Sequence, residues 1–241
     1  MTPAALIIGA GGLGCPAALA LVADGVTRLG VVDDDRVEAT NLHRQVLFGD
    51  ADVGELKVTA FARALRRRYP ELLVETHAVR FDAANAGDLI ARYDVVVDGT
   101  DNFATKFLAN DAAVLARRPL VHGAAVALAG QLLTVPVGGR PCYRCLFEEP
   151  PPAGVGPSCA EAGVLGPVPG VVGALQGVEA ARLLRGETPA FVGRLVQYDS
   201  QAMSFRIVRY NANPVCAVCG PEARIHALLP ANYPAPDCAP L

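Results

Sequence analysis

The sequence has almost no net charge and no clustered excess of basic residues. Its 241 residues include 21 Lys and Arg against 24 Asp and Glu, which gives a formal net charge of −3. A nucleic-acid-binding surface requires a basic patch or stripe, and the short run Arg66–Arg68 is more simply the solvated end of a helix. We therefore expect no nucleic-acid partner.

Charged residues are also missing from positions 1–23, so this stretch lacks the basic region with which a secretory signal peptide begins. Its glycines and Pro16 fit a strand, a loop and a helix better than a membrane span. No internal repeat or low-complexity tract is present. We expect a cytoplasmic protein with no membrane contact.

A glycine-rich loop between a strand and a helix is the first motif that carries chemistry. The apolar strand 6–8 runs into a G-x-G-x-x-G pattern formed by Gly9, Gly11, Gly12 and Gly14. Such glycines allow a tight turn and bring phosphate groups close to the N-terminus of the following helix. Asp33 ends the next predicted strand, 29–32, where an acidic residue can bind ribose hydroxyls. The stretch predicts a nucleotide site.

Four polar residues after this strand distinguish the site from that of a dehydrogenase: Asp35, Asn41, Arg44 and Lys57. A dehydrogenase holds its pyrophosphate with loop backbone, so a dehydrogenase function would not explain these four side chains. Cations brought to phosphates indicate chemistry on the phosphates themselves.

Beyond Lys57 the apolar pattern alternates between helix and strand. We predict helices at 57–68, 84–92, 103–116 and 171–184, and strands at 72–79, 94–98, 120–122, 130–136, 195–198 and 205–210. Continuous apolar strands indicate an α/β fold: a Rossmann-like, mostly parallel sheet with helices on both faces, continuing into antiparallel strands as a mixed sheet. Asp101 follows the strand 94–98, so we expect it beside the glycine loop. The Pro- and Gly-rich stretch 148–173 is predicted to be a long loop.

Two Cys-x-x-Cys pairs predict a structural zinc site. They are Cys142 with Cys145 and Cys216 with Cys219. Four thiolates at this spacing form a closed tetrahedral site with no open position for substrate. Without a secretion signal, disulfides are the poorer explanation, and two unrelated thiol pairs remain the alternative. Such a site would hold the segment after Tyr210 against the rest of the domain.

Together these motifs resemble the ThiF/MoeB/HesA adenylyltransferases, bacterial relatives of the ubiquitin-activating enzymes. The resemblance covers residues 6 to about 220. It rests on the glycine loop, Asp33-x-Asp35-x-Val37, Asn41-Leu42-x-Arg44-Gln45, Lys57, Thr100-Asp101-Asn102 and the paired cysteines. It implies ATP-dependent adenylation of the C-terminal glycine of a small ubiquitin-like sulfur-carrier protein that ends in Gly-Gly. A homodimer, a sulfur donor and a thiamine, molybdopterin or tRNA-thiolation pathway are implied with it.

The resemblance also implies roles for individual residues. The four glycines would seat ATP, Asp33 and Asp35 the ribose, and Asn41, Arg44 and Lys57 the phosphates, while Asp101 would bind Mg²⁺. Arg44, Lys57 and Asp101 would be catalytic. A terminal carboxylate has a pKa of about 3.5 and is already ionised, so the reaction needs no general base.

Cys159 lies in the predicted loop 148–173, at the position of a cysteine that in some family members joins covalently to the carrier or to sulfur. A small loop residue with no chemistry is the alternative, since no neighbouring base is identifiable.

The sequence departs from the family pattern at its start. Family members carry an N-terminal helical extension with an arginine that reaches the partner subunit's ATP, whereas only residues 1–5 precede the first strand here. A noncatalytic nucleotide-binding partner subunit therefore stays an alternative. An NAD-dependent oxidoreductase would share the glycine loop and Asp33, and adenylation of a carboxylate on modified tRNA gains no support from the charge balance.

The apolar composition, 52% of residues, favours one well-buried domain over residues 1–241. We expect a nucleotide-binding half at about 1–136. The zinc knuckles, crossover loop and C-terminal strands would follow at about 137–220, and a tail at 221–241.

Overall fold

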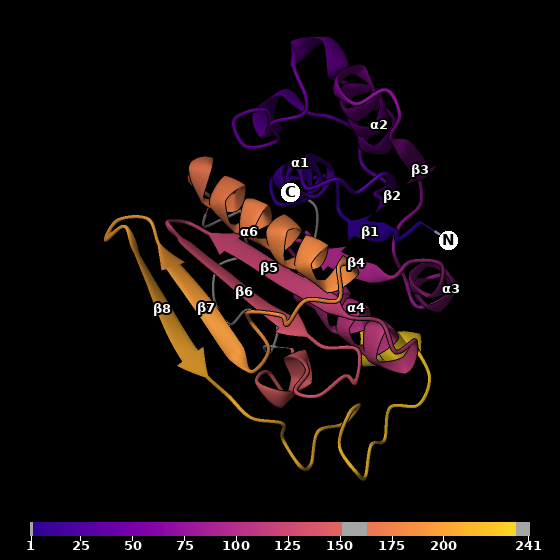
Figure 1. Cartoon of the computed structure of the whole chain (residues 1–241), viewed down its shortest axis with the longest axis vertical. Coiled ribbons are helices and arrows are strands. Elements are labelled where there is room, and N and C mark those ends of the chain that lie inside the picture. Colours follow the sequence, from indigo (N-terminus) through magenta and orange to yellow (C-terminus); the bar gives the residue numbers. More distant parts are fainter. Residues whose placement is uncertain (1, 151–162, 235–241) are drawn as a thin grey trace.

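The computed structural model describes residues 2–150 and 163–234. Eight strands of the described chain form one sheet in the order β3-β2-β1-β4-β5-β6-β7-β8 (Figure 1). The parallel strands are β3 (Leu73–His77), β2 (Arg28–Val32), β1 (Ala5–Ile8), β4 (Val95–Asp98) and β5 (Leu120–Val126). The antiparallel strands that follow are β6 (Ala129–Val135), β7 (Arg194–Asp199) and β8 (Ser204–Arg209). The predicted mixed sheet is confirmed.

Helices cover both faces of the parallel part. They are α1 (Gly14–Ala23), α2 (Lys57–Arg68), α3 (Ala86–Ala91), α4 (Phe103–Leu115) and α6 (Pro167–Leu184). Short 3-10 helices are η1 (Ala39–Asn41), η2 (Asp50–Asp52), η3 (Tyr143–Cys145) and η4 (Pro230–Asn232). Figure 1 shows α6 lying along the sheet beside α1, and the two helices pack against each other. No described helix is long and apolar enough to cross a membrane.

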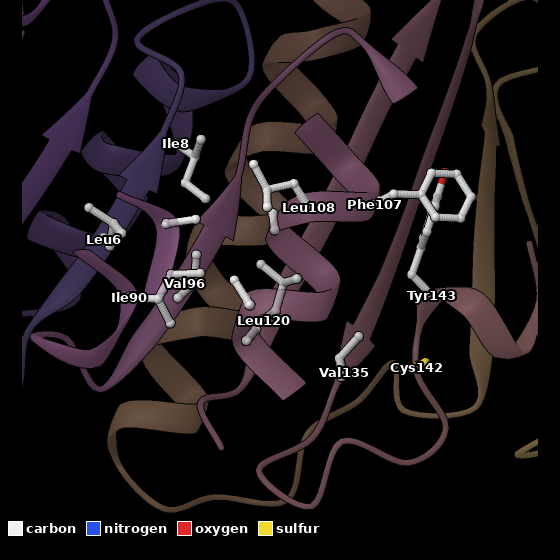
Figure 2. Packing of buried hydrophobic residues seen from close by; sticks show 14 of the residues in the cluster. Leu6, Ile8, Ile90, Val96, Phe107, Leu108, Leu120, Val135, Cys142 and Tyr143 are labelled. Atoms are coloured by element: carbon white, nitrogen blue, oxygen red, sulfur yellow. The ribbon is translucent and has the colours of Figure 1, made fainter. Parts of the chain in front are cut away.

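Alternate residues of each central strand pack in two different hydrophobic clusters, one on each face of the sheet. In β1, Leu6 and Ile8 pack in the cluster that includes α3 and α4 (Figure 2), whereas Ala5 and Ile7 pack in the cluster that includes α1 and α2. Both faces of the strand are therefore buried. This explains why the strand is an unbroken apolar run, as expected for a parallel sheet between two helical layers.

The predicted loop 148–173 is wrong for its last residues, because α6 begins at Pro167 and not at residue 171. Pro167 and Pro169 lie in the first helical turn, where the missing backbone N–H has no intrahelical partner in any case. Residues 120–126 likewise form a longer strand than the predicted 120–122, since β5 pairs with β6 along its whole length.

The segment after residue 220 packs against the core as far as it is described. Ile225 is buried, and Leu228 and Tyr233 lie against the same cluster as α4. The Tyr233 hydroxyl donates a hydrogen bond to Asp111 Oδ2 at 3.0 Å. Residues 221–234 are thus more than the tail that the sequence suggests.

The four predicted zinc ligands come together from two distant parts of the chain. The Sγ atom of Cys142 lies 3.9 Å from that of Cys145 and 3.6 Å from that of Cys216, and Cys145 lies 3.4 Å from Cys219. A tetrahedral site with Zn–S bonds of about 2.3 Å separates its sulfur atoms by roughly 3.8 Å. The donor set and its spacing fit zinc, and the alternative of two unrelated thiol pairs is wrong.

We expect protein purified without added metal to contain about one zinc per chain. Cys216→Ser should lose the metal and lower the Tm by on the order of 10 °C, because structural zinc contributes several kcal/mol and each kcal/mol moves the Tm by roughly 2–4 °C at this size. Elemental analysis and thermal unfolding measure both effects. Cys15→Ala, which removes a buried thiol outside the cluster, should keep the zinc. Well-folded protein without zinc would contradict the prediction.

Candidate active site

The candidate site lies where the strand order reverses. β1 and β4 are neighbours in the sheet, but the chain leaves β1 toward β2 on one side and β4 toward β5 on the other. Ligands of open α/β sheets bind outside the carboxyl ends of strands at such a switch point. The loops after β1 and β4 are the glycine loop, residues 9–13, and residues 99–102.

Three glycines let these two loops pack backbone against backbone. Gly9 has a φ of +92°, a conformation that side chains disfavour. A Cβ atom on Gly9 would lie 3.0 Å from the Gly99 carbonyl oxygen, and one on Gly99 would lie 3.0 Å from the Gly14 nitrogen. Within the first segment, a Cβ atom on Gly14 would lie 1.9 Å from the carbonyl oxygen of Gly9.

The first turn of α1 has no side-chain cap and no acidic residue. Cys15 and Ala17 of this turn donate their N–H groups to the Gly11 and Leu13 carbonyl oxygens. The positive end of the helix dipole, together with the glycine loop, suits an anion.

Asp33 lies directly after β2 and holds the glycine loop. Its Oδ2 accepts the Ala10 N–H at 2.7 Å, and its Oδ1 accepts the Asp35 N–H at 2.9 Å. Burial raises the pKa of Asp33, although Lys57 and the two N–H donors act in the opposite direction. Its carboxylate retains acceptor sites beyond these two bonds.

Lys57 is brought to Asp35 by local backbone pairing. Arg36 and Leu56 form a β-bridge, and the Lys57 N–H donates to the Asp35 carbonyl oxygen at 2.9 Å. The Lys57 Nζ atom then lies 2.6 Å from Asp35 Oδ2. The lysine side chain is 8% exposed and that of Asp35 66%. The structure therefore pairs Asp35 with Lys57, whereas the resemblance assigns it to the ribose.

The side chain of Arg44 lies against the glycine loop at Gly12. Its Nη2 donates to Asn41 Oδ1 at 2.8 Å. A Cβ atom on Gly12 would lie 3.3 Å from both Arg44 Cγ and Pro169 Cβ. A side chain at position 12 would thus push against the aliphatic part of Arg44. This contact, in addition to turn geometry, explains why position 12 is a glycine.

Asp101 is exposed and lies in the loop between β4 and α4. The next residue, Asn102, caps α4 by accepting the Thr105 N–H at 2.9 Å. A second group of acids follows β2: Asp33, Asp34 and Asp35 offer carboxylate oxygens within 4.8 Å of one another. Both places supply the hard oxygen ligands that Mg²⁺ prefers.

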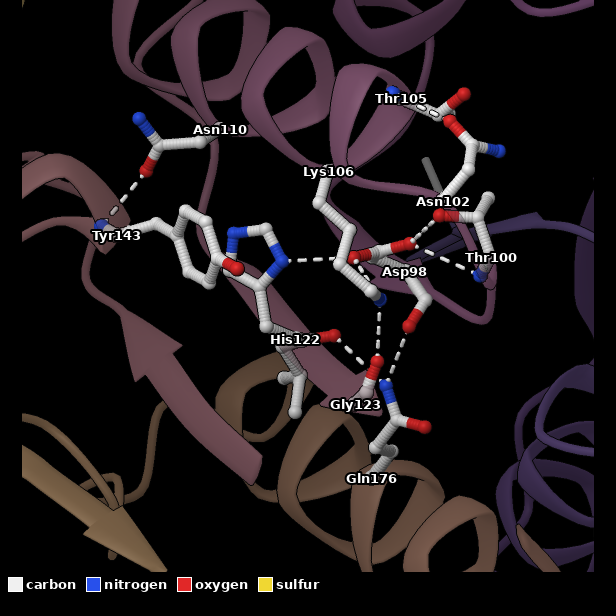
Figure 3. Close-up of polar contacts among 11 residues, drawn as sticks. Asp98, Thr100, Asn102, Thr105, Lys106, Asn110, His122, Gly123, Tyr143 and Gln176 are labelled. Carbon is white, nitrogen blue, oxygen red and sulfur yellow. Dashed lines mark hydrogen bonds and ion pairs between the residues drawn. The ribbon is translucent and has the colours of Figure 1, made fainter. Parts of the chain in front are cut away.

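A buried polar network beneath the β4–α4 loop was missed by sequence reasoning (Figure 3). Asp98, at the end of β4, contacts Lys106 Nζ at 3.0 Å and His122 Nδ1 at 2.7 Å. Burial alone would raise the pKa of Asp98, but Lys106 and His122 outweigh it and hold the pKa well below its ordinary value. The sequence feature that could have indicated this network is an aspartate at the end of an otherwise apolar strand.

Cys159 and Cys238 lie outside the described residues. Cys15 is buried at the start of α1, and burial raises the pKa of its thiol to about 12. A thiol with so high a pKa is a poor nucleophile.

Comparisons with known proteins agree on one family. The ThiF family model matches residues 3–218. The sulfur carrier protein adenylyltransferase of Thermus thermophilus is 48% identical over 222 residues, 90% of this chain and 82% of that protein. The SAMP-activating enzyme E1 of Haloferax volcanii is 48% identical over 215 residues, 89% of this chain and 79% of that protein.

Other relatives are longer than this chain. Adenylyltransferase and sulfurtransferase MOCS3 of Anopheles gambiae is 46% identical over 225 residues, 93% of this chain but 51% of that protein. A crystal structure of E. coli MccB with AMPCPP and MccA superposes with a TM-score of 0.78 at 25% identity, over 90% of this chain and 66% of that chain. With one family model matching residues 3–218 and relatives near 48% identity matching about nine tenths of its length, the chain belongs to the ThiF family.

Proposed function

We propose that this chain adenylates the C-terminal glycine carboxylate of a small ubiquitin-like sulfur-carrier protein with ATP and releases pyrophosphate. The observation that carries the proposal is that two cations lie close to the glycine loop at the strand switch point. Lys57 pairs with Asp35, next to the Asp33 that holds the Ala10 N–H, and the stem of Arg44 lies against Gly12. The sulfur carrier protein adenylyltransferase of Thermus thermophilus, at 48% identity, supports the same activity.

In this proposal the glycine loop and the N-terminus of α1 bind the phosphates through backbone N–H groups. Asp33 uses its remaining acceptor sites for the ribose hydroxyls while it keeps the Ala10 N–H. When Lys57 turns to a phosphate, the largely exposed Asp35 carboxylate gains water as its partner, and the phosphate replaces it as the counterion of the buried lysine.

The chemical step needs positioning and charge stabilisation and no general base. The carrier carboxylate, ionised at neutral pH, attacks the α-phosphorus; a carboxyl–phosphate bond forms, and the bond to the bridging oxygen of pyrophosphate breaks. Arg44 and Lys57 stabilise the negative charge that grows on the phosphate oxygens. Asp101 would hold Mg²⁺, which supplies further neutralisation of phosphate charge when bound.

The partners and surroundings follow from the same proposal. The carrier ends in Gly-Gly, a sulfur donor acts on the activated carboxyl group, and the enzyme works in the cytoplasm as a homodimer. An NAD-dependent oxidoreductase would leave both cations at the glycine loop without a role.

We expect Arg44→Ala and Lys57→Ala each to lower carrier-dependent exchange of labelled pyrophosphate into ATP by on the order of 10²–10³, with a smaller loss of ATP affinity, because both groups act on charge that develops in the transition state. Exchange assays and calorimetric ATP titrations separate the two effects. Arg67→Ala, at the exposed end of α2, is the matched control. Exchange should be absent with a carrier that lacks its terminal glycine.

Three outcomes would redirect the proposal. Full exchange activity in both alanine variants would remove the cations from the chemistry. Tight ATP binding without exchange for any Gly-Gly carrier would favour a noncatalytic nucleotide-binding subunit. Preference for NAD over ATP would favour the oxidoreductase.

Cys159 has its own test. Cys159→Ser should leave pyrophosphate exchange unchanged, since adenylation involves no thiol, and should slow complete sulfur transfer reconstituted with carrier and sulfur donor. Cys238→Ser is the control thiol. If Cys159→Ser supports sulfur transfer at the wild-type rate, the covalent role is wrong.

A further inference from the structure

The loop that carries Asp101 is fixed from beneath by a single buried carboxylate. The Thr100 N–H and hydroxyl both donate to Asp98 Oδ1, at 3.0 and 2.7 Å. Figure 3 shows the Thr100 side chain facing Asp98, the last residue of β4. Thr100 directly precedes Asp101 in the sequence. One oxygen of Asp98 is thus devoted to the loop.

The other oxygen is held by two buried bases on neighbouring elements. Lys106 of α4 and His122 of β5 both contact Asp98 Oδ2. Lys106 also donates to the Gly123 carbonyl oxygen. Burial lowers the pKa of His122, although Asp98 acts to raise it. A neutral imidazole beside one ammonium and one carboxylate leaves the cluster without net charge, which a buried site requires.

Further contacts fix the backbone around this carboxylate. Gln176 of α6 donates to the carbonyl oxygens of Asp98 and Val121, at 2.8 and 3.0 Å. The His122 ring lies against Tyr143, with ring centroids 4.5 Å apart. Asp98 is fully buried, so it cannot touch a nucleotide itself. Its effect on the site must pass through Thr100 and the loop that follows.

We propose that Asp98 is a positioning residue that acts through the Thr100 hydroxyl to orient the loop 99–102, and with it Asp101, toward Mg²⁺ and the nucleotide phosphates. The inference rests on the proposed function, which gives Asp101 its metal. It extends that function by giving Asp98 and Thr100 a role in holding the residue that would bind the metal.

Thr100 offers a gentler test than Asp98, whose replacement leaves Lys106 buried without a counterion. Thr100→Val removes the hydroxyl and keeps the backbone N–H, whereas Thr100→Ser keeps both donors. Thr105→Val, in the first turn of the same helix and outside the contacts of Asp98, is the matched control. The probe is AMPCPP, titrated calorimetrically with Mg²⁺ and again with EDTA.

We expect Thr100→Val to weaken Mg²⁺-dependent AMPCPP binding about 5- to 10-fold, the equivalent of one hydrogen bond, with binding in EDTA unchanged. Thr100→Ser and Thr105→Val should bind as the wild type does. Hydrogen exchange of peptides covering residues 99–105 should quicken in Thr100→Val and stay unchanged elsewhere. In an Asp101→Ala background, Thr100→Val should weaken binding no further, because its effect passes through Asp101.

The possible results separate the inference from the proposed function. If Asp101→Ala abolishes the Mg²⁺ dependence while Thr100→Val binds as the wild type does, the positioning role is wrong and the function stands. If Thr100→Val weakens binding equally with and without Mg²⁺, or adds its full effect to Asp101→Ala, the threonine acts on general stability and the inference also fails. If Asp101→Ala changes nothing, the metal role in the proposed function fails and the inference falls with it.

Discussion

The close approach of two loop backbones is the constraint on which the site depends. Gly9 and Gly99 leave no room for side chains between the loops that follow β1 and β4, and Gly14 leaves none against the carbonyl oxygen of Gly9. Only with that contact can the loop after β4 lie beside the start of α1, where the positive end of the helix dipole has no acidic residue in the first turn. Three positions without a side chain therefore bring together groups that lie some 90 residues apart in sequence.

The same interior supports the site and the cysteine cluster. Phe107 of α4 packs in the cluster that contains Cys142 and Cys216 (Figure 2). Arg144 lies between the first pair of cysteines and forms a bidentate ion pair with Asp111 of α4, to which its Nε and Nη2 atoms donate. The helix that begins at the Asp101 loop is thus also the platform for the metal knuckle. Loss of the metal knuckle would therefore also destabilise α4.

The sequence predicted those features whose determining residues lie close together along the chain. The glycine loop and α2 were predicted because their patterns lie within a dozen residues. The start of α6 was not, since Gly166, Pro167 and Pro169 are typical of loops unless a proline falls in a first turn. β5 was predicted too short, because the small residues Gly123 to Ala125 have weak strand propensity and are ordered by pairing with β6.

The site followed the same rule. Motifs predicted that Arg44, Lys57 and Asp101 belong to a nucleotide site, but side-chain partners on other elements could not be predicted from the sequence. The pairing of Asp98 with Lys106 and His122 joins β4, α4 and β5, and no spacing in the sequence specifies it. The partner of Asp35 was missed for the same reason, because residues 35 and 57 meet through a bridge between two loops.

The burial of both lysine side chains has a further chemical consequence. Lys57 and Lys106 are the only lysines in the chain, and each side chain is under 10% exposed and bound to an aspartate. Cationic surface is supplied by arginine instead, whose guanidinium stays protonated and does not act as an acyl acceptor. Under the proposed activity, the enzyme generates an acyl adenylate, an electrophile that amines attack readily. Lys57, the lysine in the site, is paired with Asp35, and neither lysine is exposed. The surface of this chain therefore offers the activated carrier no lysine amine with which to form an isopeptide bond.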